Sequence, residues 1–108
     1  MKILLDECVP AQVRRAFPGH AAVTVQEQGW MGIKNGALLA AAESAGFDLF
    51  IVADKNLRHQ QNLAVRRLAI LELWTNHRPT LEKHFAAIRA AAEKLKPGEY
   101  FSLDAPPS

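Results

Sequence analysis

The sequence predicts an α/β fold, a three-layer sandwich built around a mainly parallel sheet of about five strands. Two observations lead to this prediction. Short apolar runs, such as residues 49–53, end in a polar residue and lack the alternation of a half-exposed strand, which is typical of strands buried on both faces of a sheet. Helix-like stretches separate these runs along the chain, as expected when helices connect parallel strands.

The expected strands are bounded by clear breaks. A first helix follows Pro10, which suits a first helical turn, and it ends at Pro18-Gly19. Val13 and Phe17 lie four residues apart and are expected to share its buried face. Strands are expected at residues 3–5, 21–25, 49–53, 68–73 and 100–103.

Two further helices are expected between the later strands. Asn35 is expected to cap a helix that ends at Gly46. Thr80 is expected to cap the clearest helix of the chain. Its apolar residues fall on one stripe, which consists of Leu81, Phe85, Ile88 and Leu95.

Length and composition indicate one soluble domain: the chain has 108 residues, of which 49% are apolar and 22% charged. We expect a single domain over residues 1–103 and a flexible tail over residues 104–108. No apolar stretch approaches the ~20 residues that span a bilayer, and the start of the chain lacks the layout of a signal peptide. Cys8, the single cysteine, cannot form an internal disulfide. We therefore expect a cytoplasmic location and a packing role for Cys8.

Acidic residues follow two of the predicted strands. Asp6 and Glu7 come directly after the first, and Asp54 comes directly after the third. In an open parallel sheet, ligands bind beyond the carboxyl ends of the strands. Close carboxylates repel one another unless they share a proton or a cation, and Mg²⁺ or Mn²⁺ is the usual cation for oxygen ligands. The sequence therefore predicts a divalent metal site at this edge.

Each of these acids also has a simpler explanation. Asp6 could cap the helix that follows it, Glu7 could be a solvated acid near the helix start, and Asp54 could be a turn residue. Two further acids, Glu27 and Glu72, are possible site residues with no motif around them.

The charge distribution suits a phosphate-backbone substrate. The net charge is only +2, but residues 1–54 hold four Lys and Arg against six Asp and Glu, and residues 55–108 hold nine against five. Basic groups beside an acidic cluster can guide a polyanion to a metal, and a solvated helix face is the alternative explanation. The densest basic stretch directly follows Asp54 and consists of Lys55, Arg58, Arg66 and Arg67.

Several motifs, in order along residues 2–103, resemble the small PIN-like proteins of the DUF5615 type. The segment 2–7 with Val9-Pro10, the segments 28–36 and 47–57, and the shorter stretches 60–63 and 96–100 carry this resemblance. It implies a minimal PIN-like domain. PIN domains are Mg²⁺- or Mn²⁺-dependent ribonucleases, many are toxins of toxin–antitoxin pairs, and the small PIN-like group is commonly paired with a short helical protein.

The resemblance also implies roles for individual residues. Asp6 and Asp54 match PIN carboxylates, and Asn56 falls where relatives often place another acid or amide. Asn35 stands where many relatives have Asp, which reduces the charge of the site. We expect Asp6, Asp54 and Glu7 to be catalytic and Asp6, Asp54 and Asn56 to bind the metal. Substrate contacts are expected from Lys55, Arg58, Asn35 and Gln61.

Two functions therefore remain open. The first is a metal-dependent ribonuclease, for which the resemblance implies a toxin role, and its expected partners are RNA and a small helical antitoxin-like protein. The second is a catalytically weak or inactive PIN-like module that binds a helical protein or nucleic acid without cutting it. A homodimer is plausible for a domain of this size, and no membrane association is expected. Trp30, in a glycine-rich loop, is a candidate anchor for a partner.

Overall fold

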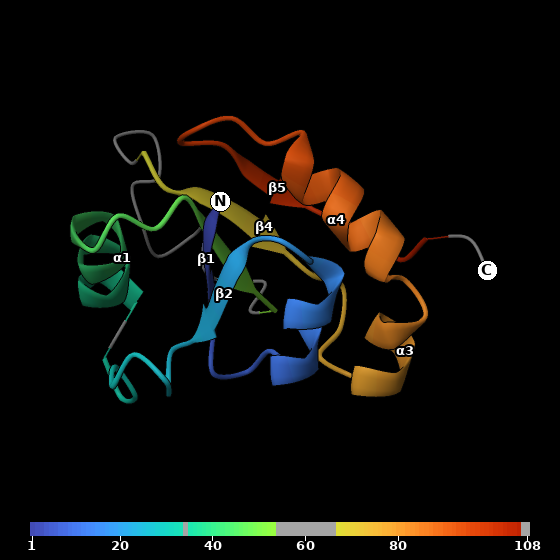
Figure 1. Cartoon of the computed structure of the whole chain (residues 1–108), viewed down its shortest axis with the longest axis horizontal. Coiled ribbons are helices and arrows are strands. Elements are labelled where there is room, and N and C mark those ends of the chain that lie inside the picture. The colour runs from blue at the N-terminus through green and yellow to red at the C-terminus, as the bar shows by residue number, and fades with distance from the viewer. Residues whose placement is uncertain (34, 54–66, 107–108) are drawn as a thin grey trace.

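The computed structural model of the chain describes residues 1–33, 35–53 and 67–106. It confirms the predicted α/β class. The strands of the described part form one sheet in which every neighbouring pair is parallel, in the order β2-β1-β3-β4-β5 (Figure 1). The strands are β1 (Lys2–Leu5), β2 (Ala21–Thr24), β3 (Leu49–Val52), β4 (Ala69–Glu72) and β5 (Tyr100–Ser102).

Helices cover both faces of this sheet and complete the predicted three layers (Figure 1). One face packs against α1, and the other packs against η1, α3 and α4. No helix in the described ranges is long and apolar enough to cross a lipid bilayer. The helices are η1, a 3₁₀ helix (Ala11–Ala16), α1 (Asn35–Ser44), α3 (Arg78–Glu82) and α4 (Phe85–Glu93).

The central strands supply the core on both faces, as their continuous apolar composition predicts. Every residue of β3 and β4 is buried. The strand register aligns side chains in rows that cross the sheet, and successive rows point to opposite faces. Leu4, Phe50 and Ile70 form a row toward α1, whereas Leu5, Ile51 and Leu71 form a row toward η1, α3 and α4.

The first predicted helix is present as a 3₁₀ helix. Val13 N–H donates to Pro10 O at 3.0 Å and Phe17 N–H to Arg14 O at 3.1 Å, both three residues apart. Pro18 explains where this helix ends, because a proline disfavours the helical conformation of the residue before it. Phe17 accordingly leaves the helix, at φ −125° and ψ 61°. Val13 and Phe17 are both buried in the same cluster, as expected.

The prediction of one helix capped by Thr80 is wrong. Two helices occupy this segment, and Thr80 lies inside the first of them, α3. Pro79 places the helix start earlier, because proline is favoured in a first helical turn. The break falls at His84, whose φ of −127° is not helical and whose ring packs edge-on against Trp74, with 5.7 Å between ring centroids. The predicted apolar stripe nevertheless packs on the sheet.

Two expectations about the loop and helix before β3 have different outcomes. Gly46 follows α1 with φ +83°, which confirms that it ends the helix, since this conformation is costly for other residues. Asn35 is the first residue of α1, and its side chain is outside the described part of the structure. Trp30 is half-buried and packs edge-on against Phe47, with centroids 5.9 Å apart, so part of its ring contacts the core, and its role as a partner anchor stays a prediction.

The central position of β4 leads to a stability prediction. Leu71→Ala removes a fully buried side chain from the row that faces η1 and α4. The variant should lose about 3 kcal/mol of unfolding free energy in urea denaturation, as expected for a cavity in a packed core. Phe101→Ala is the control, because Phe101 is 45% exposed on the edge strand and should cost about 1 kcal/mol or less. Equal losses would mean that the core is not centred on β4.

Candidate functional site

The strand order creates a topological switch point between β1 and β3. The chain leaves β1 for β2 on one side and reaches β3 on the other side, so β1 lies between them. Ligands of open parallel sheets bind at such a point, beyond the carboxyl ends of the strands. Leu5 is paired with Ile51, and the Asp6 N–H donates to Ile51 O at 3.0 Å. The two strands that the sequence predicts to carry the site are therefore neighbours.

Asp6 is half-buried at this switch point, and its carboxylate is not a helix cap. Pro10 occupies the cap position of η1 and the helix receives no side-chain cap hydrogen bond. The Asp6 carbonyl accepts from Val9 N–H at 2.9 Å, so the backbone alone closes this turn. The carboxylate Oδ2 instead accepts a hydrogen bond from Cys8 Sγ at 3.2 Å. The capping explanation is thus removed for Asp6.

Cys8 was expected to pack in the core, and this expectation is wrong because the residue is exposed. Its sulfur is nevertheless partly withdrawn from water. This desolvation, together with the adjacent Asp6 charge, raises the pKa of the thiol to about 11, against the opposing effect of a hydrogen bond from the Ala53 backbone. Cys8 therefore connects the end of β1 with the end of β3.

Most of the remaining predicted site residues lie outside the part of the chain that the structure describes. Glu7 is exposed beside Asp6. Residues 1–33, 35–53 and 67–106 contain no group of three or more His, Cys, Asp or Glu that could hold a metal ion. Asp54, Lys55, Asn56, Arg58 and Gln61 lie outside the described residues. Of the predicted metal ligands, the structure thus describes Asp6.

Glu72 is a buried acid at the same edge that sequence reasoning noted without assigning a role. It ends β4, is 4% exposed, and is paired with Val52 of β3 and Ser102 of β5. Its Oε1 accepts a hydrogen bond from the Tyr100 hydroxyl, and its Oε2 accepts from Ser102 Oγ at 3.2 Å. Glu72 therefore joins the side chains of β4 and β5, one strand away from the switch point. In the sequence, the signal for a buried acid at this edge was the position of Glu72 directly after an apolar run.

Glu27, the other acid without a motif, stabilises its own turn. Its Oε1 accepts from the Thr24 N–H at 2.9 Å and from Arg14 Nη2 at 2.8 Å. These contacts, the Thr24 hydrogen bond first and Arg14 second, lower the pKa of the carboxyl. Glu27 is thus a structural residue of the turn after β2.

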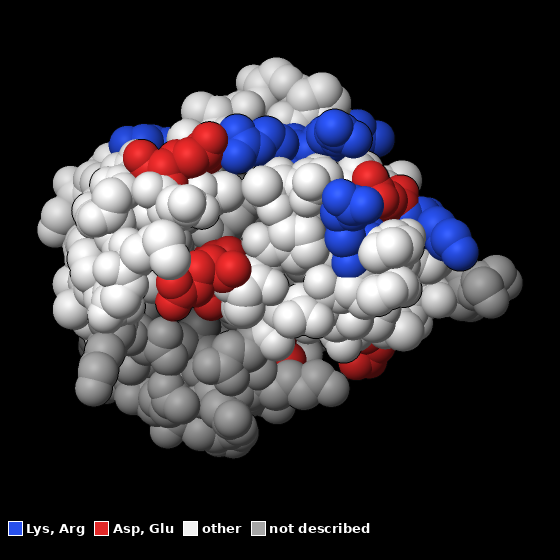
Figure 2. All heavy atoms as spheres, turned by 90° about the horizontal axis from the view of Figure 1, so that it is seen from below, with Lys and Arg blue, Asp and Glu red and all other residues white. Residues whose placement is uncertain are grey.

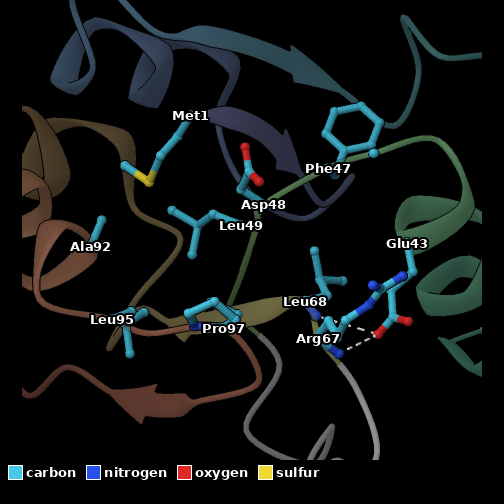
Figure 3. A pocket seen from close by; sticks show the side chains of 12 residues that line it. Met1, Glu43, Phe47, Asp48, Leu49, Arg67, Leu68, Ala92, Leu95 and Pro97 are labelled. Atoms are coloured by element: carbon cyan, nitrogen blue, oxygen red, sulfur yellow. Dashed lines mark hydrogen bonds between the residues drawn. The ribbon is translucent and has the colours of Figure 1, made fainter.

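A pocket of about 580 Å³ lies at the opposite, amino edge of the sheet (Figure 3). Its polar side chains bind backbone groups at the starts of strands. Asp48 Oδ2 accepts a hydrogen bond from the Lys2 N–H at 2.8 Å. Glu43 Oε1 accepts from the Arg67 N–H at 2.9 Å and from the Leu68 N–H at 3.3 Å, both just before β4. This pocket is therefore separate from Asp6, and the switch point remains the stronger candidate site.

The face at the carboxyl edge carries both acidic and basic side chains. Figure 2 views the molecule from below Figure 1, the side toward which β1 and β2 run. One acidic group lies near the middle of this face, and basic side chains gather along its top and right, where further acidic atoms lie among them. Basic side chains on the same face as an acidic group can attract a polyanion toward it.

Comparisons with protein-family models, with curated proteins and with solved structures found no significant match to this chain. The PIN-like assignment therefore stays a prediction from the sequence motifs, and the argument for function rests on the geometry of the switch point.

The contact between Cys8 and Asp6 predicts the reactivity of the thiol. In metal-free buffer, alkylation by iodoacetamide should rise with pH toward a midpoint of about 11. At pH 8 it should be roughly 100-fold slower than for an unperturbed cysteine, because the thiolate is the nucleophile. Asp6→Asn removes a nearby negative charge that opposes ionisation, so it should lower the thiol pKa and speed alkylation at pH 8.

Asp48→Asn is the matched control, since it removes a carboxylate at the opposite edge and should leave the alkylation profile unchanged. Identical profiles for Asp6→Asn and the native chain would show that the thiol and this carboxylate do not interact.

Proposed function

We propose that this protein is a Mg²⁺- or Mn²⁺-dependent ribonuclease whose metal site is built around Asp6. The observation that carries the proposal is the position of the Asp6 carboxylate. It is half-buried at the switch point between β1 and β3, and no helix N-terminus uses it. A carboxylate held there, without a structural cap role, suits a ligand for a cation.

The donors at this edge fit a hard divalent cation. Asp6 and Glu7 offer carboxylate oxygens, and Asp54 and Asn56 are proposed to supply further oxygens from the segment that follows β3. Cys8, beside Asp6, is a soft donor, and a hard cation prefers the carboxylate oxygens to a thiol. When bound, a divalent cation lowers the pKa of a coordinated water and neutralises charge that develops on a scissile phosphate.

The residues of the chain would then orient the substrate. We propose that Lys55 and Arg58 guide the phosphate backbone, and that Asn35 and Gln61 contact it by their amides. We also propose a cytoplasmic location, and a small helical protein as a partner of the toxin–antitoxin kind.

A second candidate is a PIN-like module that binds a helical protein or nucleic acid without cutting it. The described residues favour it in one respect, since no third acid joins Asp6 there. Glu72 and Glu27 do not fill the gap, because both carboxylates are engaged in contacts with their own strand or turn. The affinity for a metal separates the two candidates.

Metal binding tests the proposed site directly. Calorimetric titration with Mn²⁺ should show binding in the micromolar-to-millimolar range, and Asp6→Asn and Asp54→Asn should each weaken it by about tenfold or more, because each removes a charged ligand. Asp48→Asn is the control, since its carboxylate lies at the amino edge. An affinity much weaker than millimolar in the native chain would favour the non-catalytic module.

An RNA cleavage assay tests the same residues for catalysis. With Mn²⁺ present, the native chain should cleave a labelled single-stranded RNA, and Asp6→Asn or Asp54→Asn should abolish cleavage while circular dichroism shows an unchanged fold. Chelation of the metal should also stop the reaction. Retained cleavage in both variants would refute the ribonuclease proposal.

A further inference from the structure

Two arginines from different helices share one glutamate in this fold. The last turn of η1 carries Arg14 and Arg15, and the first turn of this helix has no acidic residue. The helix α3 begins with Arg78 and ends with Glu82. Because η1 and α3 pack against each other, Arg15 and Arg78 both approach Glu82. These three residues, Arg15, Arg78 and Glu82, form an arginine trio that carries a net positive charge.

The guanidinium groups of this trio keep their hydrogen-bonding capacity. Arg15 Nη1 lies 4.0 Å from Glu82 Oε2, and Arg78 Nε lies 3.7 Å from Glu82 Oε1. Both separations exceed hydrogen-bond distance, so the glutamate attracts the two cations without occupying their N–H donors. The side chains of Arg15 and Arg78 are 70% and 55% exposed. Arg14 differs, because its Nη2 donates to Glu27 at 2.8 Å.

Such an arrangement contributes little to stability. Exposed ion pairs of this kind are worth about 0–1 kcal/mol, and two like charges held near one carboxylate oppose each other. Two exposed guanidinium groups suit phosphate binding, since each guanidinium can bind a phosphate through two parallel N–H donors.

The arginines lie at the end of the molecule that carries Asp6. In Figure 1, η1 (blue) and α3 are at the lower end, toward which β1 and β2 run. Figure 2 views that end and shows an acidic group near the middle of the face, with basic side chains at the top and right and further acidic atoms among them. η1 also follows Asp6 after a short turn that ends at Pro10, so the chain itself keeps the arginine helix beside the switch point.

We propose that Arg15 and Arg78, spaced by Glu82, bind the phosphate backbone of single-stranded RNA and lead it toward Asp6. This inference rests on the proposed ribonuclease function for its choice of ligand. It adds a binding surface on η1 and α3 to the basic residues that follow Asp54, and it requires no metal for binding.

The test measures RNA binding in the absence of metal. Fluorescein-labelled oligouridylate is titrated with the full chain in EDTA, and anisotropy is followed at several salt concentrations. Arg15→Ala and Arg78→Ala should each weaken binding by about threefold, and each should reduce the slope of log affinity against log salt by about 0.7, as expected for one lost phosphate contact on a single strand. Lys96→Ala removes an exposed positive charge ahead of the amino end of β5 and should change neither quantity.

Glu82→Gln supplies a change of opposite sign. Removing the shared carboxylate leaves two unopposed guanidinium groups, so RNA affinity should rise. A purely structural role for Arg15, Arg78 and Glu82 predicts an unchanged RNA affinity and a lower unfolding free energy instead. Circular dichroism and urea unfolding of each variant establish that the fold is intact.

The inference is overturned if Arg15→Ala and Arg78→Ala bind RNA like the native chain, or if Lys96→Ala weakens binding equally. It is also overturned if polyglutamate displaces the RNA as well as unlabelled oligouridylate does, because the surface would then recognise acidic polypeptides. Failure of the ribonuclease proposal is seen separately, as absent Mn²⁺ binding and cleavage in the native chain.

Discussion

The insertion of β1 between β2 and β3 is the constraint on which the rest of this structure depends. A strand in the interior of a parallel sheet must be apolar on both faces, and Ile3, Leu4 and Leu5 are fully buried. Because the chain leaves β1 on one side and returns on the other, η1 and α1 cover opposite faces of the sheet. The end of β1 thereby becomes the switch point, and Asp6 is the residue that occupies it.

The segment between β1 and η1 converts this topology into a site. Backbone hydrogen bonds alone close the turn, from Asp6 N–H to Ile51 O and from Val9 N–H to Asp6 O. The Asp6 carboxylate is therefore not required for the local fold. A carboxylate that the turn does not need, beside a neighbouring strand end, is the physical basis of the functional proposal.

The sequence predicted the fold class and the strands well, because continuous apolar runs bounded by glycine, proline and polar residues carry a strong signal. It placed the helix boundaries less well. The first helix is a 3₁₀ helix, and Pro79 moved the start of α3 ahead of Thr80. Hydrophobic periodicity reports neither the hydrogen-bonding pattern of a short helix nor the effect of a proline in its first turn.

The site was predicted in part for a similar reason. The position of Asp6 at a strand end followed from the pattern, whereas the backbone geometry of the turn was needed to show that its carboxylate is not a helix cap. The exposure of Cys8 and the packing of Phe47 on Trp30 were not predicted, since both depend on neighbours distant in sequence. The arginine trio could not be predicted from the sequence for the same reason, because Arg15 and Glu82 meet only when η1 packs on α3.

The Glu72 contacts have a consequence for how the sheet opens. β1, β3 and β4 are joined by rows of apolar side chains, whereas the link from β4 to β5 includes hydroxyl groups on a buried carboxylate. Water can replace hydroxyl donors on a carboxylate but cannot replace apolar contacts. The outer strand is thus held by groups that solvent can satisfy. Local opening at this edge of the sheet should therefore begin at β5 and reach β4 and β3 later.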